Sequence, residues 1–209
     1  AVVERTAVIV QAQDLAAAAK AVRDAGGAIT HELGIINAVG ASLTQAQVSL
    51  IRESRSVKVF ADAPMATNAG SAPPSYASAL TEATRLHAEG ILGEGVTVAV
   101  LDTGYRSSVN MNNFRKTPRV KAQYDAISNL TLTPPFTNDE NGHGTHVSSL
   151  IIAPMKDALG KYLGIAPGVD FVSVKAFNAY GVSNYTTVIR GIEWILQNRV
   201  RYNIRILNC

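Results

Sequence analysis

The chain has 209 residues, of which 47% are hydrophobic and 17% charged, so it can bury an apolar core and is not expected to be disordered. Its formal net charge is +3, and no run of like charges is interleaved with aromatic residues, so nucleic acid is not an expected partner. No apolar run approaches the roughly 18 to 20 residues that a membrane span needs. The single cysteine, Cys209, excludes an internal disulfide framework.

The first sixty residues predict six elements in the order β-α-β-β-α-β. The four strands are rich in β-branched or small apolar residues and cover residues 2–10, 28–33, 36–41 and 57–61. Asp14 is the expected N-cap of the first helix, which Gly26 and Gly27 end. Thr44 opens a capping box for the second helix, in which Val48 and Ile51 face inward. This order predicts a ferredoxin-like α+β unit.

The composition changes abruptly at residues 64–78, which hold small residues and prolines but no charged residue. Such a segment predicts an exposed linker that proteases cut easily. We therefore expect one module over residues 1–63, the linker over 64–78, and a second module over 79–209.

Strands and helices alternate in the second module, which predicts a parallel sheet with helices on both faces. The expected strands cover residues 96–101, 119–124, 169–175 and 204–208. The expected helices lie near 79–89, from His143 to the residue before Pro154, and after a Ser183 cap, with Val188, Ile192 and Leu196 on one face. Because such a sheet needs more elements to bury its edges, we expect this α/β module to be truncated.

One carboxylate, that of Asp102, follows an apolar strand (Val98-Ala99-Val100-Leu101) and precedes Thr103-Gly104. Active sites of open α/β sheets form at this edge, although an aspartate that only caps the strand exit is equally compatible with the pattern. Asp-Thr-Gly is also the signature of aspartic proteases, but those need two such carboxylates in a β-rich protein, and this chain has one in an α/β setting.

Two histidines, His143 and His146, stand at i and i+3 at the start of an expected helix. A metal site formed with Asp102, Asp139 or Glu140 is one interpretation, but zinc pairs on a helix usually stand at i and i+4 around a glutamate. Glycines on both sides of His143 favour an acid/base imidazole at a cleft. We expect His146 to point into the packing side of the helix as a structural histidine.

The segments Val96–Gly104 and Asn141–Val147 resemble the aspartate and histidine motifs of the subtilase family, in the family's order. Gly164-Ile-Ala-Pro-Gly168 and Gly191-Ile-Glu-Trp194 resemble later segments of that family, and residues 1–63 resemble its inhibitory propeptide. The resemblance implies a serine endopeptidase in which His143 is the general base and Asp102 orients it. The resemblance also implies that the triad residues follow one another along the chain in the order Asp, His, Ser.

The chain departs from a complete enzyme because no serine stands in the Gly-Thr-Ser-Met context of the family. The resemblance places that serine and the oxyanion-binding asparagine beyond Cys209, so we expect these 209 residues alone to lack triad-dependent activity. Ser148-Ser149 replaces the Ala-Gly pair that is common in the family, which predicts that the helix beginning at His143 packs in a slightly different position.

Further expectations come from the resemblance. Gly181, Val182 and Ser183 resemble the edge segment that pairs with an extended polypeptide substrate, although an ordinary turn into a helix explains them equally well. Residues 1–63 would act as intramolecular inhibitor and chaperone, be released by a cut between about residue 60 and 78, and belong to a secreted enzyme. The sequence identifies no cofactor; family members often bind calcium, and residues 158–162 are poor in oxygen ligands, so calcium stays open.

Two alternatives remain at this point. One is a non-catalytic subtilase-like binding module in which Asp102 and His143 are relics. The other is a metal-dependent hydrolase that uses His143 and His146 together with Asp102.

Overall fold

The computed structural model describes residues 4–67 and 77–209. The chain forms two compact units, one of Ala1–Met65 with Asn184–Glu193 and one of Ala66–Ser183 with Trp194–Cys209. The first unit therefore includes ten residues from the segment that the sequence assigned to the second module. Each unit is described by itself below.

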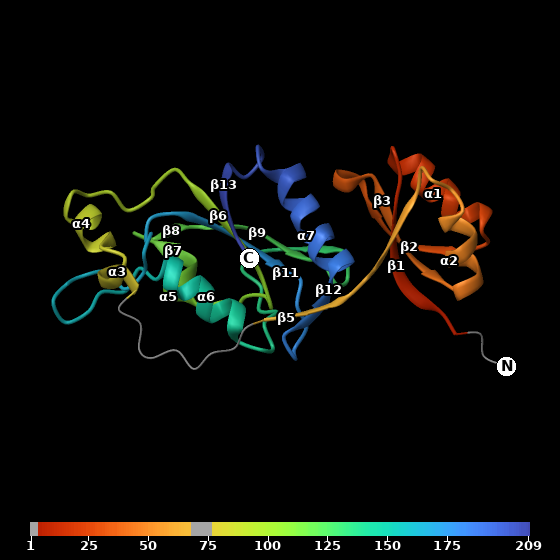
Figure 1. The fold of residues 1–209 in the computed structure, drawn as a ribbon. Coiled ribbons are helices and arrows are strands. Elements are labelled where there is room, and N and C mark those ends of the chain that lie inside the picture. Colours follow the sequence, from red (N-terminus) through yellow and green to blue (C-terminus); the bar gives the residue numbers. More distant parts are fainter. Residues whose placement is uncertain (1–3, 68–76) are drawn as a thin grey trace. The chain divides into compact units, whose positions relative to one another are not determined.

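The first unit contains the six elements in the predicted order, with one added 3-10 turn. The elements are β1 (Thr6–Gln11), α1 (Leu15–Asp24), β2 (Ala28–Leu33), η1 (Gly34–Ile36), β3 (Ala38–Leu43), α2 (Gln45–Arg52) and β4 (Lys58–Ala61). The strands form one antiparallel sheet in the order β2-β3-β1-β4. Figure 1 shows these elements in red to orange, with α1 and α2 beside each other.

Local capping chemistry explains where both helices of this unit begin. Asp14 accepts a hydrogen bond from the Ala17 amide at 2.7 Å, and Thr44 and Gln47 exchange the two bonds of a capping box. Both predicted caps are confirmed. The predicted start of the third strand at residue 36 is wrong, because the chain first makes the η1 turn and Asn37 takes a left-handed φ of 53°.

The helix α7 (Tyr185–Asn198) supplies the remaining part of the first unit through its front half. Ile189 of this helix packs against a small apolar cluster of Ile9, Leu33 and Ala38. Asp62 accepts hydrogen bonds from the Thr186 amide at 3.0 Å and from the Thr186 hydroxyl at 2.7 Å. The carboxylate thus satisfies free donors in the first turn of α7.

The second unit is built on a five-stranded sheet in the order β10-β9-β11-β6-β13. Its strands are β6 (Thr97–Asp102), β9 (Val120–Asp125), β10 (Leu130–Leu132), β11 (Asp170–Lys175) and β13 (Ile204–Asn208). Four of them run parallel, and β10 pairs antiparallel with β9. Each of the four predicted strands is present with its bounds shifted by at most one residue, and β10 was not predicted.

Side chains on the two faces of this sheet meet different helices. Val98, Val100 and Phe171 belong to a core cluster with Ile152 of α6 (His143–Ile152). On the neighbouring strand, Tyr124 stacks on Trp194 of α7 with ring centroids 4.9 Å apart. Tyr124 is in register with Val174, which lies on the opposite face to Phe171 because side chains alternate along a strand. Helices therefore cover both faces, as predicted.

Three details of the segments around this sheet differ from what the sequence predicts. The helix expected near 79–89 is two short helices, α3 (Ala77–Leu80) and α4 (Ala83–Ala88), because Glu82 takes a left-handed φ of 59°. The linker expected at 64–78 begins with the strand β5 (Pro64–Ala66), and its residues 68–76 lie outside the described part. Leu196 of α7 is 42% exposed, whereas Val188 and Ile195 are buried.

Three short elements complete the chain between β6 and β9: α5 (Val109–Asn112), β7 (Asn113–Phe114) and β8 (Thr117–Pro118). β7 pairs with β8, and β12 (Val182–Asn184) pairs with β5, each as a two-stranded sheet. Ser183 is part of β12, and its hydroxyl donates to the Ala176 carbonyl at 2.6 Å, so it is not the cap of α7. Asn184 takes that place, because its side-chain oxygen accepts from the Thr187 amide at 3.1 Å.

Candidate active site

Asp102 is the last residue of β6, a strand in which all six residues are buried. Its neighbours β11 and β13 flank it on both sides, so the carboxylate stands at the carboxyl end of a central strand. The residue is 7% exposed. One carboxylate oxygen also accepts the Thr103 amide at 2.6 Å, so the strand-exit cap considered from the sequence is present as well.

His143 is the first residue of α6, and its ring faces Asp102. The ring nitrogen Nδ1 lies 2.7 Å from one carboxylate oxygen of Asp102 and 2.9 Å from the other. This geometry assigns the Nδ1 proton to the bond with Asp102 and leaves Nε2 as the basic nitrogen of a neutral ring. The side chain is 25% exposed, and Nε2 makes no hydrogen bond within residues 4–67 and 77–209.

The glycine after His143 lets α6 begin directly against the turn that follows Asp102. A Cβ at Gly144 would lie 2.4 Å from the Gly104 carbonyl oxygen and 3.1 Å from the Cβ of Asp102. Gly104 itself has a φ of 118°, and a Cβ added to it would lie 2.5 Å from the carbonyl oxygen of Asn138. The expectation that glycine permits close approach beside His143 is therefore met at Gly144, because any larger residue would push the two motifs apart.

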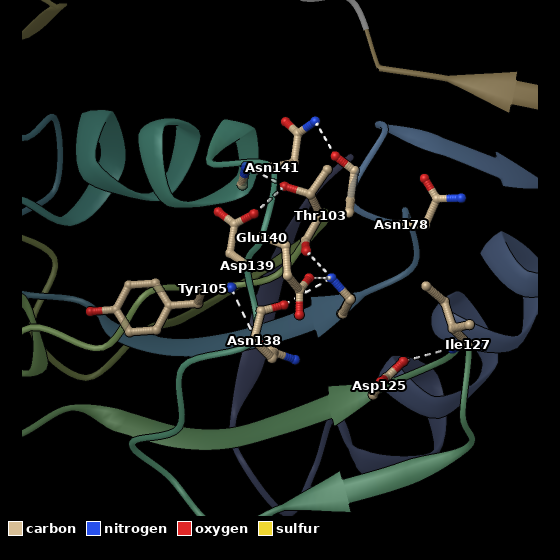
Figure 2. Close-up of polar contacts among 12 residues, drawn as sticks. Thr103, Tyr105, Asp125, Ile127, Asn138, Asp139, Glu140, Asn141 and Asn178 are labelled. Carbon is tan, nitrogen blue, oxygen red and sulfur yellow. Dashed lines mark hydrogen bonds and ion pairs between the residues drawn. The ribbon is translucent and has the colours of Figure 1, made fainter.

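Asp139 is a buried residue beside the candidate site, and the sequence offered it only as a possible metal ligand. It is 2% exposed, and its carboxylate accepts hydrogen bonds from Thr103, Gly142 and Thr145. Figure 2 shows Thr103 and Asp139 turned toward one another. Burial alone would raise the pKa of this carboxyl, but the hydrogen bonds from Thr145, Gly142 and Thr103 outweigh it and hold the pKa below its ordinary value.

A buried lysine lies on the neighbouring strand. Lys175 is in register with Asp102 and is 7% exposed. Its Nζ donates to the Thr103 carbonyl at 2.7 Å, the Asn138 carbonyl at 2.8 Å and the Glu140 carboxylate at 2.6 Å. The bond from Lys175 lowers the pKa of Glu140. No pattern in the sequence pointed to Lys175; only the strand register brings it here.

Gly181, Val182 and Ser183 lie at the edge segment that leads into and through β12. Gly181 has a φ of 71° and accepts the Thr67 amide on its carbonyl at 2.8 Å. Asn141, two residues before His143, donates to the neighbouring Ala179 carbonyl at 3.0 Å. The structure thus brings the edge segment and the histidine loop together, and it shows an extended stretch of chain bonded to that edge.

The expectation for His146 is wrong. His146 is exposed, because the buried stripe of α6 is formed by Gly144, Ser148 and Ile152, and residue 146 lies about half a turn away from Ser148. In the described part of the chain, no three His, Cys, Asp or Glu side chains gather in a way that could hold a metal ion. The metal-hydrolase alternative has no ligand set there.

The loop around residues 158–162 has one carboxylate, that of Asp157. Asp157 uses one oxygen to accept the amides of Leu159 and Lys161, at 2.8 and 2.9 Å. The ammonium of Lys156 lies 4.5 Å from the ring centroid of Tyr162 in the same loop. Calcium prefers six to eight oxygen ligands, and the one carboxylate of this loop already accepts two amides on one of its oxygens, so its side chains offer calcium few free ligands.

Comparisons with known proteins agree with this geometry. A family profile described as the subtilase family matches residues 93–208, more than half of the chain, and this range includes both motifs. The chain belongs to the subtilase family. Of the helices in the described residues, none combines the length and the hydropathy that crossing a bilayer demands.

Over the aligned residues, this chain is about 30% identical to curated subtilases. It is 31% identical over 180 residues to the thermostable alkaline protease of Halalkalibacterium halodurans, covering 86% of the chain and 45% of that protein. It is 29% identical to subtilisin E of Bacillus subtilis, covering 86% and 44%. The chain thus spans somewhat less than half the length of these relatives.

A solved structure shares the fold. Fervidolysin of Fervidobacterium pennivorans, described as a keratinolytic enzyme related to subtilisin, superposes with a TM-score of 0.66. The match covers 93% of this chain and 34% of fervidolysin at 22% identity, so it supports the subtilase fold and no finer property.

Proposed function

We propose that this chain is part of a serine endopeptidase in which Asp102 and His143 are two members of a catalytic triad. The observation that carries the proposal is the pair of short contacts from His143 Nδ1 to the Asp102 carboxylate, at 2.7 and 2.9 Å, with Nε2 left unbonded among the described residues. The serine is proposed to lie outside these 209 residues, in the part of the relatives that this chain does not match.

The roles of the two residues follow from their geometry. A serine hydroxyl is a weak nucleophile until a neighbouring base takes its proton, and His143 Nε2 is placed to be that base and then to protonate the leaving amine. Asp102 holds the tautomer with the proton on Nδ1 and stabilises the imidazolium that forms, without taking the proton. Burial of Asp102 strengthens this ion pair because water screens it little.

The substrate class we propose is an extended polypeptide that pairs with the edge at Gly181, Val182 and Ser183. The bond from the Thr67 amide to the Gly181 carbonyl supports this proposal, because it shows that the edge accepts an extended backbone. Val182 is 40% exposed beside this edge.

We further propose that residues 1–63 are a ferredoxin-like propeptide that inhibits the enzyme and assists its folding, residues 64–78 the processed linker, and residues 79–209 the front of the catalytic domain. The order of elements and the strand order β2-β3-β1-β4 support the ferredoxin-like assignment. Phe60 lies inside β4, paired with Ile9, so we place the cut after that strand. We also propose that the protein is secreted, because an attached inhibitory propeptide would keep the protease inactive until export.

Two substitutions in the full-length protein test the catalytic assignment. Asp102→Asn and His143→Ala should each abolish release of the propeptide, since loss of a triad member costs on the order of 10⁴ to 10⁶ in turnover. Release is followed by gel electrophoresis and mass spectrometry of the new amino terminus. Cleavage in cis by either variant would overturn the assigned roles and favour the non-catalytic module.

The 209-residue chain by itself should show no triad-dependent hydrolysis, because it carries the proton-handling half of the site without the nucleophile. A fluorophosphonate probe, which labels activated serines, tests this directly. Labelling of the isolated chain at one unique serine would contradict the proposal.

A further inference from the structure

The carboxylate of Asp139 is the most heavily bonded polar group beside Asp102 and His143. One oxygen accepts the Thr103 hydroxyl at 2.8 Å and the Gly142 amide at 2.7 Å. The other accepts the Thr145 amide at 2.9 Å and the Thr145 hydroxyl at 2.5 Å. Every donor is an uncharged hydroxyl or amide, so the carboxylate is held by directed bonds and not by a cation.

The residues that donate to Asp139 stand directly beside the two catalytic residues in the sequence. Thr103 follows Asp102, Gly142 precedes His143, and Thr145 lies two residues after it. The Thr103 hydroxyl also accepts the Gly144 amide at 2.8 Å, so one hydroxyl joins the residue after Asp102 to the residue after His143. Asp139 fixes the direction of that hydroxyl, because its proton is used in the bond to the carboxylate.

The loop that carries Asp139 is itself fixed from the other side. Lys175 bonds to the carbonyls of Thr103 and Asn138, and the guanidinium of Arg106 donates to the Asp139 carbonyl at 2.8 Å. Figure 2 shows Asn138, Asp139, Glu140 and Asn141 as consecutive side chains around Thr103. The carboxylate therefore has a rigid support, which a group that positions others requires.

We propose that Asp139 is a positioning residue that sets the Asp102–His143 geometry through the Thr103 hydroxyl and the first turn of α6. This inference rests on the proposed function, because it concerns the same site. The side chain touches neither substrate nor reacting atoms, and it acts by holding the turn after Asp102 and the turn before α6 in one arrangement.

The chemistry of the site requires a carboxylate at this position. All four bonds use Asp139 as an acceptor, and an ionised carboxylate is an acceptor at both oxygens. An asparagine of the same shape would place an N–H against either the Thr145 amide or the Gly142 amide. The bond to that backbone amide would be lost and leave its buried N–H unpaired, and the hydroxyl on the same oxygen would have to turn and accept instead of donating.

The first test compares Asp139→Asn with Glu140→Gln in the full-length protein that carries the serine. Both substitutions remove one negative charge from neighbouring positions, but Glu140, with a side chain 60% exposed, contacts neither Thr103 nor Thr145 through its carboxylate. We expect Asp139→Asn to lower kcat about 10- to 100-fold with KM changed less than about twofold, since small misplacements of catalytic groups cost such factors. Glu140→Gln should change both constants by less than about threefold.

A second pair of variants tests the route through Thr103. Thr103→Ser keeps the bridging hydroxyl, so its kcat should stay within about threefold of the parent. Thr103→Val has the same shape without the hydroxyl, and its kcat should fall by the same factor as that of Asp139→Asn. The loss of kcat in the double variant Asp139→Asn with Thr103→Val should be clearly smaller than the two single losses combined, because both changes remove the same Thr103–Asp139 bond. Additive losses would overturn the proposed route.

Active-site titration and proton NMR separate positioning from a loss of folding. The kcat values are expressed per titrated site, and the downfield Nδ1 proton of His143 reports its bond to Asp102. We expect this resonance to weaken in Asp139→Asn and to persist in Glu140→Gln. If Asp139→Asn lowers only the melting temperature or the titrated fraction, with kcat and the resonance unchanged, its role is structural and the inference is wrong.

The catalytic variants separate a failure of the proposed function from a failure of the positioning inference. If Asp102→Asn and His143→Ala keep full hydrolysis, the proposed function fails. If they abolish hydrolysis while Asp139→Asn has the same kcat per titrated site as the parent, the proposed function stands and only the positioning inference fails.

Discussion

Ser148 is a residue whose burial conflicts with its chemistry. It is 0% exposed in the middle of α6, and its hydroxyl has no hydrogen-bond partner among the described residues. A buried hydroxyl without a partner costs about 1 to 3 kcal/mol relative to an apolar group of similar size. The adjacent Ser149 differs, because its hydroxyl donates to the His146 carbonyl at 2.7 Å.

The substitution Ser148→Ala should raise the free energy of unfolding by about 1 kcal/mol, because it removes the unpaired hydroxyl and opens little space. Ser149→Ala is the matched control and should stay within about 0.5 kcal/mol of the parent. Urea denaturation followed by circular dichroism measures both. A destabilising Ser148→Ala would show that the hydroxyl is bonded and that α6 needs it.

At the scale of the element, the start of α6 decides how His143 meets Asp102. The helix begins at a glycine-flanked histidine, and Gly144 lies against the Gly104 carbonyl with no room for a Cβ. Gly142, on the other side of His143, has a φ of 100° and no atom within 4 Å of an added Cβ. The two glycines therefore serve different needs, close packing at Gly144 and backbone conformation at Gly142.

Gly144→Ala should displace the first turn of α6 from the Asp102 turn and destabilise the chain by about 1 to 3 kcal/mol, the usual cost of overpacking. The downfield proton of His143 should be lost in the same variant. Gly142→Ala meets no steric contact and should cost about 1 to 2 kcal/mol through its left-handed backbone. Thermal melts and proton NMR measure both; an unchanged His143 resonance in Gly144→Ala would contradict the packing argument.

At the scale of the whole molecule, each of the two units has its own apolar core, and the acids of the described residues with a shifted pKa lie in one loop. One core forms around Val10, Val22 and Leu43, and the other around Val98, Tyr105 and Phe171. Asp139 and Glu140, the two acids with a lowered pKa, both lie in the loop before His143. The acid sensitivity of the second unit is therefore concentrated beside the candidate site.

Acid should destabilise the second unit through Asp139. The pKa of Asp139 is lower in the folded chain than its ordinary value of about 3.9, so between these two pKa values the unfolded state binds more protons. The stability that this carboxylate contributes is complete above pH 4 to 5 and is lost as the pH falls through the folded pKa. Asp139→Asn should lower the melting temperature at pH 7 and flatten its decline from pH 5 to pH 2. An equally steep decline would assign the acid sensitivity to other groups.

The sequence predicted most elements and singled out the two candidate catalytic residues because the signals involved are local. A capping box at Thr44, a cap at Asp14 and an apolar run ending in Asp102 each act within a few residues, so they are visible without a fold. The motif around His143 is equally local, since its glycines stand next to it.

Only the tertiary structure decided which distant groups support those local motifs. Asp139 joins Thr103 to Thr145, Lys175 reaches Thr103 across 72 positions of sequence, and Asp62 reaches Thr186 across 124. No periodicity or spacing encodes such pairs, because strand register and loop closure bring them together. The exposure of His146 and the assignment of residues 184–193 to the first unit were likewise fixed by packing against distant chain segments. The sequence alone thus pointed to the pair Asp102 and His143, while the contacts that align the two side chains exist only in the folded chain.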